Sequence, residues 1–300
     1  MLHKAVPFAQ INLMKSYLSL IKFSHTIFAL PFALLGFFLA TLKGGSTINW
    51  KLFGLVILAM VFARSAAMAF NRYLDRDIDA KNPRTATREV PAGVISPSSA
   101  LLFVVANSGL FMLVSWLINP LCFYLSPIAL IVILGYSYTK RFTALCHFVL
   151  GLGLSLAPIG AYLAVTGQFN FIPILYSAVV LLWVSGFDII YAMQDEGFDR
   201  SLDLHSVPAA LGQKKSLILS SFLHLLCALV VVATSYQLGI HFPQFGFLHW
   251  IGVVAFVGLL FYQHLLVKPN DLSKVNLAFF TTNGFASIIL CSFIVLDIFI

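Results

Sequence analysis

The chain has 300 residues, of which 60% are hydrophobic and 10% are charged, and its mean hydropathy is +0.95. A soluble domain of this length does not have such a composition, so the sequence predicts a polytopic membrane protein. The net charge of +7 is explained by membrane topology and anionic lipid headgroups, and it gives no reason to expect nucleic-acid binding.

Nine apolar segments of roughly membrane-spanning length follow one another along the chain. Asn119-Pro120 separates the third from the fourth, because proline restricts the residue before it and ends helices. The expected fold is all-α, with about nine transmembrane helices in a single integral membrane domain over residues 1–300. The segments are 17–41, 51–73, 98–118, 121–138, 144–166, 172–192, 215–237, 246–268 and 276–299.

The basic residues lie mostly on one side of the predicted membrane. With nine helices, the N-terminus and the loops after the second, fourth, sixth and eighth helices share that side. Of the 18 Lys and Arg residues, 15 lie there, Lys43 and Lys51 lie on the other side, and Arg64 lies within the second helix. The positive-inside rule makes this side cytoplasmic, and the expected location is the inner membrane of a bacterium.

The acidic residues form two clusters, each at the end of an even-numbered helix. Asp75 and Asp79 are four residues apart, which puts both carboxylates on one helix face. Asp195 and Asp199 have the same spacing. Acids at the end of a membrane helix are costly, so they indicate a functional site, and Mg²⁺ would relieve their repulsion with phosphate and water as its other ligands.

The two clusters align as an internal repeat. Residues 71–79 (Asn-xxx-Asp-xxx-Asp) match residues 191–199 (Tyr-xxx-Asp-xxx-Asp), and residues 90–93 resemble residues 207–212. This weak symmetry predicts two pseudo-repeated halves around a central cavity, with the site at their interface. The halves and the last helix are expected at about 17–138, 144–268 and 276–299.

Basic residues near the acids suit a diphosphate that is bound through Mg²⁺, because they clamp the oxygens that the metal does not take. For each of them the alternative is an ordinary positive charge of a cytoplasmic loop. The candidates are Arg72, Lys81, Arg84, Arg88, Lys140, Arg141 and Lys215.

With these motifs the whole chain resembles the UbiA family of intramembrane aromatic prenyltransferases. The resemblance implies Mg²⁺-dependent transfer of a polyprenyl chain from polyprenyl diphosphate to an aromatic acid of the 4-hydroxybenzoate type, in quinone biosynthesis. Relatives that act on 4-hydroxybenzoate often carry Lys-Pro-x-Gly in the first helix, where this chain has Lys22-Phe-Ser-His25. A naphthoate acceptor of menaquinone synthesis is therefore the alternative.

The resemblance also implies roles for individual residues. Asp188 matches a recurrent family position and would orient the acceptor or take its ring proton, or else support the metal site or a helix. Lys140 and Arg141 resemble a basic pair that faces the diphosphate. One Mg²⁺ would be held by Asn71, Asp75 and Asp79, and the other by Asp195 and Asp199. The candidate catalytic residues are Asp75, Asp195 and Asp188.

Arg64 is seven residues before Asn71 and thus about two helical turns deeper in the membrane. An arginine at that depth needs an anionic partner, which would be the acceptor's carboxylate or an Asp of the second cluster. Lys22 is a further candidate for the acceptor's carboxylate. The expected partners are thus polyprenyl diphosphate, a small aromatic acid and the lipid bilayer.

A cation-coupled transporter is the competing function, because carriers also have duplicated halves, broken helices and buried carboxylates. A carrier places its site near the middle of the bilayer. The acids of this chain instead lie at helix ends beside basic loops, which favours the enzyme.

Overall fold

The computed structural model describes residues 15–21, 28–44 and 48–300, and every named element within them is a helix. Residues 15–20 form a short helical stretch that precedes these elements. Their bounds are α2 Leu30–Gly44, α3 Trp50–Leu74, α4 Arg76–Asp79, α5 Pro97–Ile118, α6 Pro120–Thr139, α7 Cys146–Thr166, α8 Phe171–Ala192, η2 Met193–Asp195, α9 Glu196–Ser201, α10 Val207–His241, α11 Leu248–Leu266, η3 Leu277–Thr282 and α12 Asn283–Phe299.

Within the described residues, eight helical spans are long and apolar enough to cross a membrane, and the apolar helix at Leu30–Leu42 is shorter. The protein is therefore an integral membrane protein with the all-helical fold that the sequence predicts. The 15 residues of α2 extend about 22 Å at 1.5 Å per residue, less than the roughly 30 Å of a hydrocarbon core.

Two helix boundaries differ from the predicted ones. In the segment expected at 17–41, the described residues form a short helical stretch at 15–20 and the long helix α2 from Leu30, where Pro31 occupies the first turn and favours a helix start. The seventh helix begins at Val207 instead of 215, and it is broken at Gly212, whose φ is 74° and ψ is 166°. The predicted break at Asn119 is confirmed, since this residue caps both α5 and α6.

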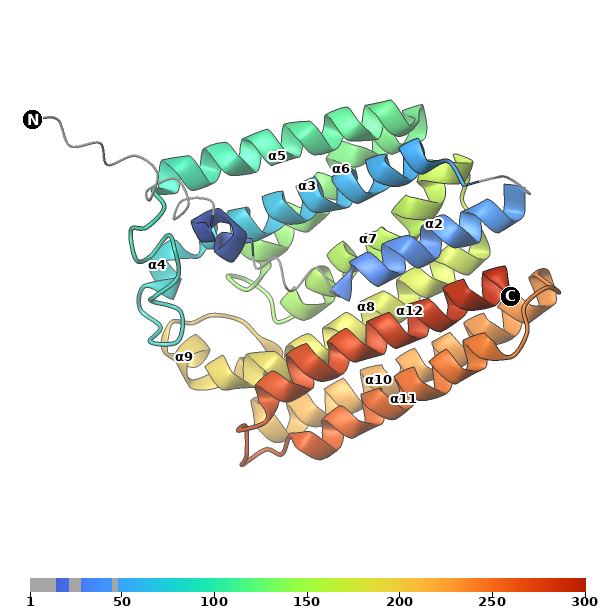
Figure 1. The fold of residues 1–300 in the computed structure, drawn as a ribbon. Helices are drawn as coiled ribbons and strands as arrows, with labels where there is room; N and C mark the ends of the chain where they lie inside the picture. The colour runs from blue at the N-terminus through green and yellow to red at the C-terminus, as the bar shows by residue number, and fades with distance from the viewer. Residues whose placement is uncertain (1–14, 22–27, 45–47) are drawn as a thin grey trace, which may run out of the picture.

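The long helices lie side by side in a bundle, with α4 and α9 at the same end and the C-terminus at the other (Figure 1). Six helices form a closed ring in which each packs against the next, in the order α2, α7, α8, α10, α11 and α12, and α12 packs against α2. A second group, made of α3, α5 and α6, packs against this ring through α7. The loops that follow α3 and α8 are thereby brought together.

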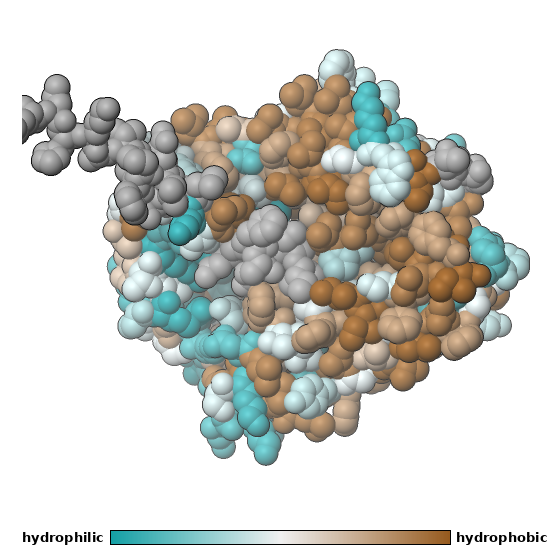
Figure 2. Space-filling model, in the orientation of Figure 1, coloured by the Kyte–Doolittle hydropathy of each residue, from teal (hydrophilic) through white to brown (hydrophobic). Residues whose placement is uncertain are grey.

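The surface of the bundle is largely apolar (Figure 2). Hydrophilic residues gather mainly at its two ends, with a large group at the end that holds α4 and α9. Large side chains such as Leu102, Ile131 and Val254 are exposed along the helices. Such an apolar belt is what contact with lipid requires.

The last membrane span contains a π-helical turn, η3, which widens the helix just before α12. The Asn283 side-chain amide donates to the carbonyls of Ala278 at 2.9 Å and Phe279 at 3.0 Å. Its oxygen accepts a hydrogen bond from Trp183 Nε1 at 2.8 Å. The turn directs Phe279 against Tyr191, with 4.0 Å between the ring centroids.

Helices α2 and α7 approach each other most closely at Gly36. A Cβ added there would lie 2.0 Å from the carbonyl oxygen of Pro158, so only glycine fits this contact. Gly54 in α3 has nothing within 4 Å of such a Cβ and provides a matched control.

We expect Gly36→Ala to lower the midpoint of thermal unfolding in detergent by several degrees, because overpacking typically costs about 1–3 kcal/mol. Gly54→Ala should leave it unchanged or raise it slightly, since alanine favours helix by up to about 1 kcal/mol over glycine. Thermal unfolding followed by circular dichroism measures both. Equal midpoints for the two variants would contradict the close α2–α7 contact.

Candidate active site

Both acidic clusters begin where a membrane helix is interrupted. Asp75, between α3 and α4, has φ −88° and ψ 4°, and Asp195, the last residue of η2 and the N-cap of α9, has φ −102° and ψ 3°. This sparsely populated backbone region is one in which active-site residues often occur. Further along, Gly93 and Gly212 both have a φ of 74°. The sequence repeat aligns Asp75 with Asp195, and Gly93 and Gly212 end its two similar downstream segments; the duplication itself stays a prediction.

Asp75 is buried and accepts bonds from several donors. The Asn71 side-chain amide donates to Oδ2 at 3.0 Å, and Lys140 Nζ lies 3.2 Å from the same oxygen. Arg141 donates to Oδ1 at 2.9 Å. Asp79, one turn later, is also buried and is bound by Arg88, which donates to both carboxylate oxygens at 2.8 Å.

Asp195 of the second cluster obtains its partners from the loop of the first. Asn82 donates to Asp195 Oδ1 at 3.1 Å, and Arg84 donates to it through Nε at 3.0 Å and to Oδ2 through a second nitrogen. Burial opposes the charge of Arg84, but the bonds and charge of Asp195 outweigh it and raise the pKa of this guanidinium. Arg84 also donates to the Tyr191 hydroxyl at 2.9 Å. Loop 80–96 thus joins the two halves.

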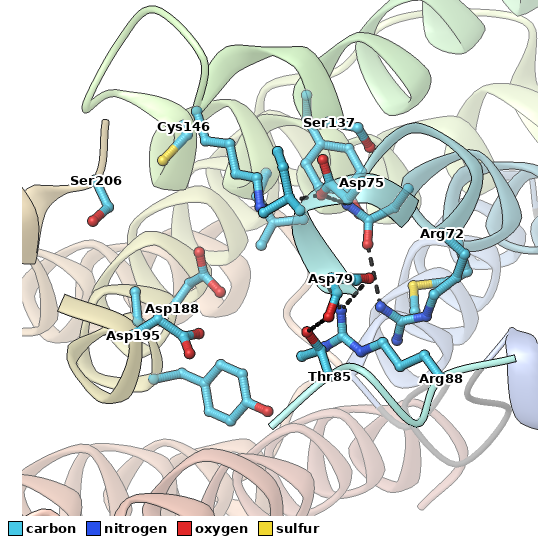
Figure 3. Close-up of a pocket in the computed structure, with 18 of the residues that line it drawn as sticks. Arg72, Asp75, Asp79, Thr85, Arg88, Ser137, Cys146, Asp188, Asp195 and Ser206 are labelled. Atoms are coloured by element: carbon cyan, nitrogen blue, oxygen red, sulfur yellow. Dashed lines mark hydrogen bonds and ion pairs between the residues drawn. The ribbon is translucent and has the colours of Figure 1, made fainter. Parts of the chain in front are cut away.

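A cavity of about 570 Å³ lies between the two clusters. Figure 3 shows Asp75 and Asp79 on one side of it and Asp188 and Asp195 on the other. One part of the wall is apolar and comes chiefly from α7 and α8. It includes Leu150, Leu154, Val184 and Phe187, together with Phe28 and Phe279.

Two arginines of α3 line this cavity, and among the described residues neither has an ion pair with a carboxylate. Arg72 is buried and donates only to Asn71 Oδ1 at 3.5 Å. The Nε atoms of Arg64 and Arg72 are buried and have no hydrogen-bond partner within the part of the chain that the structure describes. Buried charges are normally paired, so both side chains favour an anion in the cavity.

Asp188 lies on the wall formed by α8, and it is bonded to a histidine that the sequence reasoning did not identify. His147 Nδ1, in the first turn of α7, is 2.7 Å from Asp188 Oδ2. The histidine is almost fully buried, whereas 20% of the Asp188 side chain remains exposed.

Most predicted site residues line the cavity, but three do not. Arg141 is absent from the wall, because its guanidinium also binds the carbonyls of Ser137 and Leu74 and therefore lies behind Asp75. Its predicted contact with the diphosphate stays a prediction. Lys81 and Lys215 are exposed away from the cavity. Lys22 lies outside the described residues. The predicted residues on the wall are Arg64, Asn71, Arg72, Asp75, Asp79, Arg84, Arg88, Lys140, Asp188, Asp195 and Asp199.

Sequence reasoning missed Asn82 and His147. An Asn-Pro pair at 82–83 signals a turn, and Asn82 Oδ1 accepts from the Arg84 backbone at 3.0 Å, which bends the loop toward the cavity. His147 carried its own signal, because an ionisable side chain within a membrane helix is a site candidate by default.

The cavity has donors that fit Mg²⁺, which takes oxygen ligands and commonly uses only one or two carboxylates with substrate phosphates. Asp75 and Asp79 with the Asn71 amide oxygen present such ligands on one side, and Asp195 with Asp199 on the other. Among the described residues, no three His, Cys, Asp or Glu side chains converge on one point. This suits an ion that shares its ligands with a phosphate group better than one enclosed by protein alone.

Comparison with known proteins agrees with this arrangement. A family model described as the UbiA prenyltransferase family matches residues 29–287. The 4-hydroxybenzoate octaprenyltransferase of Aliivibrio fischeri strain MJ11 is 32% identical to this chain, over 78% of this chain and 80% of that protein. The 4-hydroxybenzoate octaprenyltransferase of Nitrosospira multiformis is 30% identical, over 80% of this chain and 81% of that protein.

Solved structures are similar over almost the whole chain. An apo UbiA homolog from Aeropyrum pernix K1 has a TM-score of 0.78 at 31% identity, covering 91% of this chain and 98% of that one. A UbiA homolog from Archaeoglobus fulgidus bound to GPP and Mg²⁺ has a TM-score of 0.70 over 95% of this chain and 100% of that one. At 21% identity, the second likeness concerns the fold alone.

We expect Asp75→Ala and Asp79→Ala each to weaken binding of Mg²⁺-diphosphate at least about tenfold, because a charge-assisted contact contributes about 1.5–3 kcal/mol. Asp77→Ala is the matched control, since this acid lies on the same short helix with its side chain 82% exposed. Isothermal titration of purified protein measures the affinities. Wild-type affinity in both Asp75→Ala and Asp79→Ala would rule out the first cluster as a metal–diphosphate site.

Proposed function

This chain belongs to the UbiA prenyltransferase family and is therefore a transferase, and we propose that it moves a polyprenyl chain from polyprenyl diphosphate to an aromatic acid of the 4-hydroxybenzoate type, in quinone biosynthesis. The observation that carries this proposal is the cavity, which has acidic clusters on both sides and, on its wall, Arg64, whose buried Nε has no hydrogen-bond partner among the described residues. The transporter alternative is set aside, because the family consists of transferases.

The names of the similar proteins support the acceptor. The relatives from Aliivibrio and Nitrosospira are named for 4-hydroxybenzoate, and each is about 30% identical to this chain. A naphthoate acceptor would use the same donor site and the same carboxylate contact, so the two acids differ only in the ring that the apolar wall must admit.

The donor's diphosphate would lie between the two acidic clusters. Three basic side chains of the cavity wall bind carboxylates in this structure, namely Arg84, Arg88 and Lys140. They would bind phosphate oxygens in place of these carboxylates when the diphosphate enters. Bound Mg²⁺ would neutralise charge on the leaving diphosphate. The residues that would hold it are Asn71, Asp75, Asp79, Asp195 and Asp199.

The acceptor would lie deeper, beside Arg64 and Asp188. Arg64 is seven residues before Asn71, about 10 Å along α3, and it would bind the acid's carboxylate. Asp188 would accept the proton that the ring loses after its carbon has bonded to the prenyl group. The apolar wall of α7 and α8 would keep water from the allylic cation.

The site would face the cytoplasm of a bacterial cell from the inner membrane. The acidic clusters lie at one end of the bundle, and 15 of the 18 basic residues belong to the segments predicted on that side. A water-soluble acid would then arrive from the cytosol, while the prenyl tail remains in lipid.

The acceptor is tested by giving the purified protein a polyprenyl diphosphate, Mg²⁺ and a panel of aromatic acids in lipid nanodiscs. We expect mass spectrometry to find prenylated 4-hydroxybenzoate and an equal amount of free diphosphate. A product only from 1,4-dihydroxy-2-naphthoate would move the acceptor to the menaquinone route. Absence of any prenylated aromatic acid would contradict the proposed function.

We expect Arg64→Ala to raise the apparent KM for the aromatic acid about ten- to a hundredfold, because it removes a charge-assisted contact to the carboxylate. Lys140→Ala should instead raise the KM for the prenyl donor. Steady-state kinetics with each substrate varied in turn measures both. If Arg64→Ala changes only the donor KM, Arg64 belongs to the diphosphate site.

A further inference from the structure

His147 connects two parts of the site that lie on different elements. Its Nδ1 is 2.7 Å from Asp188 Oδ2, on the wall proposed for the acceptor. Its Nε2 is 3.2 Å from the backbone nitrogen of Val207, the first residue of α10. The ring is 3% exposed, so water does not substitute for either partner.

These two bonds fix the tautomer of His147. The Val207 nitrogen is a donor, so Nε2 must accept and cannot carry a proton itself. The ring proton is therefore on Nδ1 and points at Asp188. In this state the imidazole is neutral, and Asp188 receives one directed hydrogen bond.

The same helix start also holds the second acidic cluster. Ser206 caps α10, where its hydroxyl oxygen accepts from the Ala209 backbone at 3.2 Å. The Ser206 hydroxyl proton is donated to Asp199 Oδ2 at 2.8 Å. Asp199 is thus linked to Asp188 in steps: Asp199 is hydrogen-bonded to Ser206, the next residue Val207 is hydrogen-bonded to His147, and His147 is hydrogen-bonded to Asp188.

We propose that His147 is a positioning residue that fixes both sides of the reaction: its Nδ1 proton orients Asp188 to take the ring proton, and its Nε2 anchors the start of α10 so that Ser206 orients Asp199 toward the donor. This inference rests on the proposed function. It assigns to one histidine two separable effects, one on the acceptor and one on the donor.

The acceptor step involves a single proton. A ring carbon bonds to the first carbon of the allylic cation, using an electron pair of the ring, and the diphosphate has already left with the electrons of the C–O bond. The same ring carbon then loses its hydrogen as a proton to the carboxylate of Asp188, and the electrons of that C–H bond restore the aromatic ring. His147 keeps its own proton throughout.

Two substitutions separate the two bonds. The amide of Asn ends near the position of Nδ1, so His147→Asn retains a donor for Asp188 and loses the acceptor for Val207. The amide of Gln ends near the position of Nε2, so His147→Gln retains the acceptor for Val207 and loses the bond to Asp188. His241→Gln, at the exposed far end of α10, is the control.

On the acceptor side, the readout is the kinetic isotope effect with ring-deuterated aromatic acid. We expect an effect near 1 for wild type, His147→Asn and His241→Gln. His147→Gln should show an effect above about 2 on kcat, because removal of the ring proton then limits the rate. Equal isotope effects in the Asn and Gln variants would overturn the link between His147 and Asp188.

On the donor side, the readout is binding of an unreactive geranyl thiolodiphosphate with Mg²⁺, measured by titration. His147→Asn should weaken this binding about fivefold, the effect of one neutral hydrogen bond, whereas His147→Gln should stay near wild type. Equal affinities in the two variants would overturn the link between His147 and Asp199.

These outcomes are distinguishable from failure of the proposed function. If wild-type protein prenylates no aromatic acid, the proposed function has failed and so has the role of Asp188. The donor experiment still decides the link to Asp199, because it requires no acceptor. Thermal unfolding of the Asn and Gln variants verifies that both are folded, and opposite defects in two folded variants exclude a merely structural effect.

Discussion

Carboxylates at the edge of a low-dielectric membrane protein need partners, because an unpaired buried charge costs several kcal/mol. In this chain the partners come from other segments than the acids. Lys140 and Arg141, after α6, bind Asp75, which ends α3. Arg84, from the loop of the first half, crosses to Asp195 in the second. Of these pairs, Arg84–Asp195 connects the two halves at this end of the bundle.

The same pairs make the site suited to a charged ligand. A diphosphate that entered between the clusters would bring negative charge to Arg84 and Arg88, and the carboxylates that they released would become available to a cation. Each charged group would then exchange one partner for another and would never be left alone in the protein interior. Arg141 differs, because its bonds to two backbone carbonyls keep it behind Asp75 during such an exchange.

Local patterns in the sequence predict much of this site, while contacts over long separations do not follow from them. The four-residue spacing of Asp75 and Asp79 and the apolar lengths of the helices were sufficient to expect membrane helices that end in acids. Nothing in the local sequence pairs Arg84 with Asp195, which is 111 residues away. The break in α10 was likewise not foreseen, because Gly212 within a helical pattern is a weak signal by itself.

The π-helical turn η3 also affects how this chain is compared with its relatives. A π turn contains one residue more than the α-helical path it replaces, and an α-helix rotates about 100° per residue. Loss of one residue within η3 would therefore rotate Phe279 away from Tyr191, whatever residue types remained. An alignment with a relative whose last span is regular needs a one-residue gap here. Without that gap, the side chains that precede η3 would be matched to the wrong face of the helix.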